Sequence, residues 1–385
     1  MDSSYSIRLP LFMELLESTD TTMAKKARIW DGSQWVDIAS AVTDLTQYAN
    51  LTTTPVSGFR NAIINGDFGI NQRGFTSTTS NTTYGFDRWM NAVSGGTATM
   101  SAQAFTVGSS AAVGYESQNF LRQVVSGQST SGNYASVLQH IEDVRTYAGA
   151  VVTVSFWAKA GSGIPKIAIE FQQQFGSGGS PSSTVFTNAG QVTLSTSWAR
   201  YSVTATVPSI SGKTIGTTAN TSSLALNLWT SAGSDYNTRS GSLGIQNNTF
   251  DLWGVQVERG TIATPFEQIP IGTELSLCQR YFYSIIGGEL SIYNPYFNVG
   301  LSGGGQYVPT RHPVNMRVAP AMPSTTAFTY LQNAAGTALG FNVGLGSTIS
   351  GFTGTYSSTS NSGSVLPSAY TIGYNQATIN LSSEF

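Results

Sequence analysis

Val151-Val-Thr-Val-Ser-Phe-Trp-Ala-Lys-Ala160 is the segment whose residue pattern indicates the fold most clearly. Every second residue from Val152 to Ala158 is apolar. The residues between them are Thr153, Ser155 and Trp157. Successive side chains of a β-strand point to opposite faces, so this alternation predicts a strand with one buried face. The stretch is too regular in its period of two to be read as a helix.

The same period of two recurs along the middle of the chain, in residues 166–175, 198–207 and 223–231. Clusters of Gly, Ser and Asn separate these runs. Antiparallel strands with one apolar face, spaced by turns, are typical of two sheets packed face to face. We therefore predict an antiparallel β-sandwich over residues 59–272. A short helix is also expected at Asp143–Ala148, with Asp143 as its N-cap.

The chain on either side of this sandwich has a different pattern. Residues 1–58 contain Asp31-Gly32 between Trp30 and Trp35, which indicates a β-hairpin, and a short stretch of helix-like spacing follows it. This segment is too small to bury a core alone, so we expect it to pack on a partner chain or on its own copies. Further strand-like runs predict a second, smaller β domain at residues 273–385.

Composition excludes several classes of function. Charged residues make up only 10% of the chain, while 40% are hydrophobic and 11% aromatic, which favours folded, turn-rich β structure over disorder. A net charge of -2 does not indicate a nucleic-acid-binding surface, which needs clustered Lys and Arg. The single Cys278 excludes an intramolecular disulfide. No apolar run is long enough to span a bilayer, and the first 22 residues do not have the pattern of a signal peptide.

One set of residues has the chemistry of a sugar-binding face. Three tryptophans fall on the polar sides of their strands, together with amide and guanidinium groups, and sugars are bound by aromatic stacking and hydrogen bonds. The set is Trp157, Trp198, Trp229, Gln172, Gln174, Asn227 and Arg200. The alternative is that loops or neighbouring subunits cover the face and bury the tryptophans. A fourth tryptophan, Trp253, is expected in the core beside Val255 and Val257.

Signals for catalysis are poor, so we do not expect an enzyme. Gly300-Leu-Ser-Gly-Gly matches the Gly-x-Ser-x-Gly motif, but that motif requires a strand-to-helix turn and no helical pattern follows. His140 and His312 are the only histidines, and neither has metal-ligand spacing to another ligand. Paired carboxylates for glycoside hydrolysis remain open on sequence alone.

Several segments together resemble phage and prophage tail-fibre proteins. The resemblance begins with Arg-Asn-Ala-Ile-Ile-Asn-Gly-Asp-Phe at 60–68 and extends over most of the chain. The other matching segments are 72–74, 87–89, 139–149, 154–160, 250–258, 263–267, 271–281 and 313–320. The opening and closing strands also resemble jelly-roll carbohydrate-binding modules, which implies a jelly-roll topology for the sandwich.

The second resemblance also bears on metal binding. In such modules a structural calcium is often held near the Asn-Gly-Asp-Phe strand, and the matching acids here are Asp67 and Asp251. Gly69 stands where the family has a further acid. Because calcium takes six or more oxygen ligands, the set is incomplete. We expect no cofactor, with calcium as the alternative that the resemblance leaves open.

The resemblance implies a structural protein of a bacteriophage virion, of fibre type, synthesised in the host cytoplasm. Residues 1–58 would attach to other virion proteins, and the rest would bind host surface polysaccharide. Fibres of this kind are homotrimers, whose three weak sites gain affinity by multivalency. Two alternatives stay open: a head-decoration or tail-adaptor protein without a receptor, and an enzyme that degrades surface polysaccharide. We expect neither nucleic-acid binding nor membrane insertion.

Overall fold

The computed structural model of the chain describes side chains mainly in residues 59–112 and 114–284. The remaining described residues are 28–30, 35–37, 285, 306–311, 313–318, 331–333, 338–339, 341–348, 351–358, 370–371 and 379–385. The chain divides into two compact units, Met1–Gly58 and Phe59–Phe385. The predicted boundary between residues 272 and 273 stays a prediction.

The first unit contains the predicted hairpin. Strands β1 (Arg28–Trp30) and β2 (Trp35–Asp37) pair antiparallel, with Trp30 opposite Trp35. The Asp-Gly pair from which the hairpin was predicted lies between these strands in sequence, outside the described residues. The helix-like stretch that follows lies outside the described residues.

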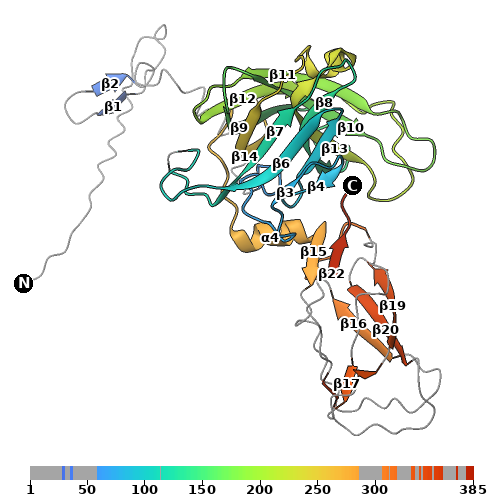
Figure 1. Ribbon diagram of the computed structural model, residues 1–385. Coiled ribbons are helices and arrows are strands. Elements are labelled where there is room, and N and C mark those ends of the chain that lie inside the picture. Colours follow the sequence, from blue (N-terminus) through green and yellow to red (C-terminus); the bar gives the residue numbers. More distant parts are fainter. Residues whose placement is uncertain are drawn as a thin grey trace, which may run out of the picture. The chain divides into compact units, whose positions relative to one another are not determined.

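Two antiparallel sheets of six strands form the body of the second unit (Figure 1). Sheet I has the spatial order β11 (Val185–Thr193), β10 (Lys166–Gln174), β13 (Ser223–Ala232), β8 (Tyr134–Glu142), β5 (Met90–Ser94) and β4 (Thr83–Tyr84). Sheet II has the order β12 (Ala199–Thr206), β9 (Val151–Ala160), β14 (Thr249–Arg259), β7 (Asn119–Ser126), β6 (Thr97–Ala104) and β3 (Ser77–Thr78). The predicted all-β jelly-roll sandwich is confirmed.

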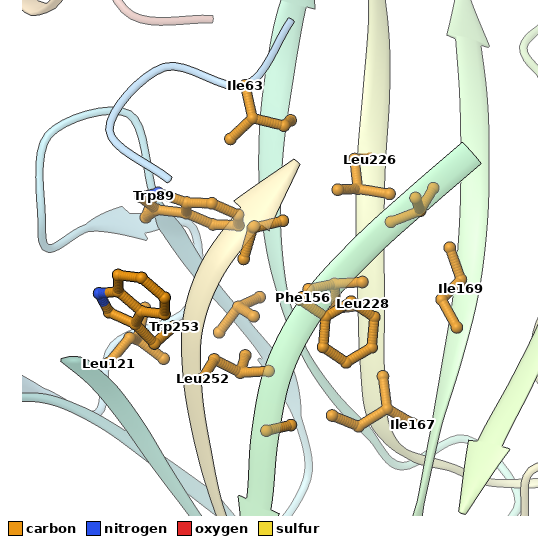
Figure 2. Close-up of a cluster of buried hydrophobic side chains, with 14 of the residues drawn as sticks. Ile63, Trp89, Leu121, Phe156, Ile167, Ile169, Leu226, Leu228, Leu252 and Trp253 are labelled. Carbon is orange, nitrogen blue, oxygen red and sulfur yellow. The ribbon is translucent and has the colours of Figure 1, made fainter. Parts of the chain in front are cut away.

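The core lies between the inner faces of these two sheets. Phe156 of β9 comes from sheet II, while Ile169 of β10 and Leu226 of β13 come from sheet I, and all three are fully buried (Figure 2). They occupy the apolar positions of the alternation, so the face of each strand that is turned toward the opposite sheet is the one that the sequence predicts. The prediction that only one face is buried is wrong for β9, β10 and β13, whose outward positions are buried as well. Burial of a large side chain of this kind stabilises the fold by about 1.5–3 kcal/mol.

The Asn-Gly-Asp-Phe segment is fixed by backbone contacts with the rest of the sandwich. The Asn65 side chain exchanges hydrogen bonds with the main chain of Ile70, at 2.8 and 2.9 Å. The backbone carbonyl of Asn65 accepts the indole N–H of Trp89 at 2.9 Å. A Cβ on Gly66 would lie 2.2 Å from the carbonyl oxygen of Val255. Only glycine therefore lets this segment approach β14 closely enough to pair with it.

Helices are short and differ from the predicted one. Residues 144–149 form turns: Asp143 has a φ of +67°, and the backbone bonds run from Thr146 N–H to Asp143 and from Ala148 N–H to Arg145, three residues back. The predicted helix there is wrong. The sequence analysis missed α4 (Ile271–Gln279), η1 (Ser234–Tyr236) and α3 (Asn237–Ser240). Among the described residues, no helix is long and apolar enough to cross a membrane.

The last part of the chain adds short antiparallel strands. They are β15 (Phe282–Ile285) with β22 (Ile379–Ser382); β16 (Gln306–Arg311), β20 (Gly351–Ser358) and β19 (Phe341–Thr348); and β18 (Ala338–Leu339), β17 (Leu331–Asn333) and β21 (Tyr370–Thr371). The segment after β22 packs on the sandwich, where Glu384 forms ion pairs with Arg88 and Arg73. Since Arg88 is fully buried, Glu384 is the charge that compensates it.

Replacing Phe156 with alanine is expected to lower the free energy of unfolding by about 3–5 kcal/mol, because a cavity is left between the sheets. The matched control is Phe59→Ala, since Phe59 is 64% exposed. We expect the control to change stability by no more than about 0.5 kcal/mol. Urea unfolding followed by tryptophan fluorescence measures both. Similar losses for the two variants would contradict the core assignment.

Candidate functional site

The outer face of sheet I, the side turned away from the core, carries a continuous row of residues across all six strands. The strand registers align one residue from each strand, in the spatial order Asn188, Glu170, Asn227, Leu138, Met90 and Tyr84. Directly opposite residues on neighbouring strands have Cβ atoms about 5 Å apart. The row therefore changes from polar at the β11 edge to apolar at β8 and β5.

Glu170 is the charged centre of this face. Its side chain is fully buried, and Oε2 accepts hydrogen bonds from Gln172 Nε2 at 3.0 Å, Asn227 Nδ2 at 3.1 Å and Trp229 Nε1 at 3.1 Å. Arg239 of α3 donates Nε to Oε1 at 2.7 Å and Nη2 to Oε2 at 3.0 Å. A buried carboxylate is stable only when it is paired and hydrogen-bonded, and these donors meet both conditions.

Aromatic rings surround the same ion pair. The Arg239 guanidinium lies 3.9 Å from the ring centroid of Phe186 and 5.0 Å from that of Trp229. Tyr134 and Tyr236 contact Trp229, with ring centroids 5.7 and 5.4 Å away. Trp229 is only 2% exposed, whereas Phe186 is 45% exposed. Phe186 is therefore the most exposed of these rings, Tyr134 and Tyr236 are partly exposed, and Trp229 serves mainly as a hydrogen-bond donor and packing residue.

A hydrogen-bonded chain of side chains extends from Glu170 along the face. Gln174 Nε2 donates to Gln172 Oε1 at 3.3 Å, and the Ser223 hydroxyl donates to Gln174 Oε1 at 3.2 Å. The Ser223 oxygen lies 3.0 Å from His140 Nδ1. Because a carboxylate only accepts, every donor in the chain points toward Glu170, and His140 supplies an Nδ1–H to Ser223. Burial, Arg88 and Arg317 lower the pKa of His140 to about 3, so the ring is neutral.

Residues from the end of the chain cover the face beyond His140. The Phe385 ring stacks on His140, with centroids 5.0 Å apart and planes 21° apart. The guanidinium of Arg317 lies 3.9 Å from the Phe385 centroid. The polar residues around Glu170 are thus flanked by α3 on one side and by this aromatic stack on the other.

Loops cover the part of the outer face of sheet II around Trp157. Trp157 is 9% exposed and lies in a cluster with Trp253, Tyr115 and Phe266, whose ring centroids are 5.2, 6.0 and 6.4 Å from its own. The guanidinium of Arg200 is 4.7 Å from the Trp157 centroid and donates to Ser155 and to the Thr264 carbonyl. For Trp157 and Arg200 the structure therefore agrees with the alternative that loops bury this part of the face.

The seven residues proposed as one sugar-binding face lie on two sheets. Gln172, Gln174, Asn227 and Trp229 belong to sheet I, whereas Trp157, Arg200 and the adjoining Trp198 belong to sheet II. The expectation of a single shared face is wrong, because alternation within a strand does not say which sheet the strand joins. Trp198 is half-buried and has Lys159 5.3 Å from its ring centroid. The binding roles themselves stay predictions.

A bulge changes the position of the fourth tryptophan. Trp253 pairs with Trp157, but the register then shifts so that Gln256 pairs with Ser155. Gly254, with a φ of +63°, provides the backbone conformation for this shift. Trp253 is buried as predicted, yet it lies on the Trp157 side of the sheet rather than on the same side as Val257.

The two acids that the resemblance pairs as calcium ligands have different surroundings. The Asp251 carboxylate receives Nε and Nη2 of Arg122 at 2.6 and 2.8 Å and lies 3.6 Å from Lys159 Nζ. Asp67 accepts the Gly69 N–H at 3.1 Å, and burial raises the pKa of its carboxyl group. Among the described residues there is no group of three or more His, Cys, Asp or Glu side chains placed to hold a metal. Calcium binding stays a prediction.

Asp67 also borders a cavity of about 370 Å³ between the opening segment and the start of α4. Two other carboxylates line it. Glu267 accepts the backbone N–H of Asn61 at 2.8 Å, and Glu274 accepts that of Asn65. Burial raises the pKa of Glu274 to about 7, with further contributions from Asp67 and Glu267. The cavity is acidic, and its acids are used to hold the opening segment in place.

Comparison with known proteins gives one family match. Residues 105–232 match the family model described as a carbohydrate binding domain. The matched residues are about a third of the chain and run from the loop before β7 to the end of β13. The chain therefore contains a segment similar to carbohydrate binding domains, and this segment holds Glu170, Asn227 and Trp229. No curated protein matches the chain.

Solved structures similar to the chain include two carbohydrate-binding modules. The CBM22-2 xylan-binding domain of Paenibacillus barcinonensis Xyn10C is 18% identical, with 48% of this chain and 98% of that domain covered at a TM-score of 0.29. The family 11 carbohydrate-binding module of Clostridium thermocellum, in complex with a β-1,3-1,4-mixed-linked tetrasaccharide, is 11% identical, with 49% and 99% covered at a TM-score of 0.28. The sandwich itself is established by the strand pairings of this chain.

Sequence reasoning missed the residues that organise the outer face of sheet I. Glu170 stood out only as one polar residue among several on its strand, and Arg239 lies 69 positions further along, in the short helix α3. Phe186 sits on β11, where the alternation is weaker. A charged residue in the middle of a strand whose neighbours are all apolar or amide-bearing was the available signal, because a buried charge requires a partner.

Replacing Arg239 with leucine is expected to lower the free energy of unfolding by about 3–5 kcal/mol, because the buried Glu170 carboxylate loses its opposite charge. The control is Arg145→Leu, which breaks the exposed pair between Arg145 and Asp143. Exposed pairs contribute at most about 1 kcal/mol. Chemical denaturation measures the free energy of unfolding of both variants. Equal losses would show that Arg239 is not needed to stabilise the buried Glu170 carboxylate.

Glu274→Gln is expected to become more stable relative to the wild type as pH rises. The pKa of Glu274 is about 7 in the folded protein against an ordinary value of 4.5, so the folded state holds a proton that the unfolded state loses. Wild-type stability therefore falls between about pH 5 and pH 8, by up to about 3 kcal/mol from this group. Urea unfolding at several pH values tests this. A stability difference between variant and wild type that does not change with pH would refute it.

Proposed function

We propose that this chain is a non-catalytic bacteriophage virion protein of fibre type that attaches to the host surface by weak, multivalent glycan binding. The observation that carries the proposal is the outer face of sheet I. There the Glu170 carboxylate, which is paired with Arg239, amide side chains and an exposed aromatic ring lie within the segment similar to carbohydrate binding domains. These are the groups that bind neutral sugars by stacking and hydrogen bonding.

The glycan-binding part of the proposal is assigned to sheet I rather than to sheet II. Gln172 and Asn227 are fixed by Glu170, so they are ordered before a ligand arrives. Preorganised groups lose little conformational entropy on binding. Phe186 offers an apolar ring face of the kind on which a sugar ring stacks, and Arg239 holds that ring from one side.

The attachment part of the proposal is supported by the resemblance of the segments at 60–68, 250–258 and 313–320 to tail-fibre proteins, together with the hairpin of the first unit. A homotrimer with residues 1–58 bound to other virion proteins would present three copies of the face together. Linking weak sites in this way raises avidity by about 10²–10⁴ without new contacts, provided that all sites reach the same surface. Host surface polysaccharide is a ligand with such repeated sites.

The purified chain is expected to bind host surface polysaccharide, and Phe186→Ala and Gln172→Ala are each expected to weaken binding about tenfold, from lost stacking and hydrogen bonds. Phe59→Ala is the matched control, because Phe59 is an exposed phenylalanine outside this face. Glycan-array binding and titration calorimetry measure the affinities. Release of reducing ends from the polysaccharide would contradict the non-catalytic role.

The virion role is tested separately. Sedimentation of the full chain is expected to give the mass of a trimer, and antibodies against it are expected to label a virion fibre. Virions that lack the protein are expected to adsorb poorly to host cells. Normal adsorption without the protein would reject the attachment role even if the purified chain binds glycan.

A further inference from the structure

Three charged side chains lie in one row on the outer face of sheet II. In the strand registers, Lys159 of β9 is opposite Asp251 of β14, and Asp251 is opposite Arg122 of β7. Arg122 donates Nε and Nη2 to the Asp251 carboxylate at 2.6 and 2.8 Å, and Lys159 Nζ lies 3.6 Å from the same carboxylate. We call these three residues the charged row. Two positive charges share one negative charge, so one positive charge is left uncompensated.

The two cations of the charged row are open to solvent, whereas the carboxylate is enclosed. The side chain of Asp251 is 3% exposed, while those of Lys159 and Arg122 are 30% and 33% exposed. Trp157, two positions before Lys159 on β9, is 9% exposed. The loops that cover Trp157 therefore do not close over the charged row, and a group from outside the chain can reach both cations.

Both cations keep hydrogen-bond donors for a ligand. A guanidinium presents its N–H groups as a rigid planar fork, and Asp251 takes the edge formed by Nε and Nη2 of Arg122. Neither Arg122 Nη1 nor Lys159 Nζ donates a hydrogen bond to any residue that the structure describes. The edge formed by Nη1 and the second N–H of Nη2 therefore remains available, and such an edge matches the two oxygens of a carboxylate.

Aromatic rings border the same two cations. Lys159 Nζ lies 5.3 Å from the Trp198 ring centroid, and the Arg122 guanidinium lies 5.5 Å from that of Phe120. The Trp198 centroid is 5.4 Å from that of Phe120 and 5.6 Å from that of Phe105. Trp198 and Phe105 are each partly exposed. The apolar face of a sugar ring packs on rings of this kind, so charge and apolar surface lie side by side here.

We infer that the charged row binds the carboxylate of a uronic acid in an acidic polysaccharide. The remaining edge of the Arg122 guanidinium donates to the two carboxylate oxygens at about 2.8 Å, and the Lys159 ammonium lies beside them. The sugar ring packs on the exposed part of Trp198. The neutral-sugar binding proposed above stays with sheet I, and the charged row adds a second class of sugar on the opposite sheet.

Other ligand chemistries fit the charged row less well. A uronate carries a single negative charge at neutral pH, which balances the uncompensated positive charge. A neutral sugar gains nothing from that charge. A phosphate monoester carries about two negative charges, more than the row balances. Nucleic acid is held by many cations spread along its backbone, and the row has only Lys159 and Arg122.

The test uses trimers of galacturonic acid and of glucuronic acid, each compared with its methyl ester, which keeps the sugar ring and removes the negative charge. Titration calorimetry with the full chain is expected to give about tenfold tighter binding of the acids, because hydrogen bonds between charged groups are stronger than those to a neutral ester. Raising the NaCl concentration from about 0.05 M to about 1 M is expected to remove most of this preference, since both cations are partly exposed.

Lys159→Gln is expected to weaken binding of the acids about threefold to fivefold and to leave binding of the esters unchanged. This variant keeps the hydrogen bonds between Arg122 and Asp251, so the buried carboxylate retains its partner. The matched control is Lys213→Gln. Lys213 is an exposed lysine in the loop beyond the end of β12, whereas Trp198 lies just before its start. The control is expected to bind acids and esters as the wild type does.

Equal affinity of the wild-type chain for acids and esters, including no measurable binding of either, would overturn the inference. A Lys159→Gln variant that keeps the full preference for the acids would overturn it as well. Phe186→Ala, which alters sheet I, is expected to keep that preference. Binding of neutral host polysaccharide without any preference for acids would leave the proposed function intact and reject only the site on sheet II.

Discussion

A carboxylate that is excluded from water in the middle of a sheet determines much of what surrounds it. Glu170 cannot remain charged at its position unless nearby groups replace the hydrogen bonds of water, and four side chains do so. Those side chains come from β10, β13 and α3. The position of α3 over the sheet, the burial of Trp229 and the orientation of each amide on the face follow from that single requirement. The inner core holds the two sheets together, whereas Glu170 orients the polar side chains on the outer face of sheet I.

Alternation was sufficient to predict which side of each strand faces the core between the sheets, but not that the outward side of β9, β10 and β13 is buried as well. The apolar positions of β9, β10 and β13 all point inward. A one-residue shift in strand register would turn every one of them to the outer face, so the apolar pattern favours the observed register. Alternation could not predict which strands share a sheet. Trp157 and Trp229 occupy equivalent outward positions, yet they belong to different sheets and are covered by different loops. Long-range pairing of this kind is not encoded in any local pattern.

Local exceptions to the period of two explain the remaining differences. Gly254 allows a bulge that places Trp253 on the opposite side from Val257. An isolated glycine inside a strand pattern was the available signal for this bulge. The partner of Glu170 is also non-local, since Arg239 lies outside the segment that matches the carbohydrate binding domain model. A family match therefore locates the strands of the face but omits the cation that makes the face stable. The amide groups could be predicted from the strand pattern, but the ion pair of Glu170 and Arg239 that orients them could not.

The pairing of β15 with β22 has a consequence for how the chain can vary. Phe282 lies opposite Ser382 and Ile285 opposite Ile379, so the chain leaves this ribbon and returns to it at adjacent points. The residues after β22 then anchor to Arg88 and His140 on the sandwich. A segment that connects residue 285 to residue 379 needs only to have its two ends about 5 Å apart, the distance between neighbouring strands. Doubling the length of such an insert adds only about 0.6 kcal/mol of loop-closure entropy. Inserts of different length can therefore be accommodated between β15 and β22 while sheet I stays unchanged.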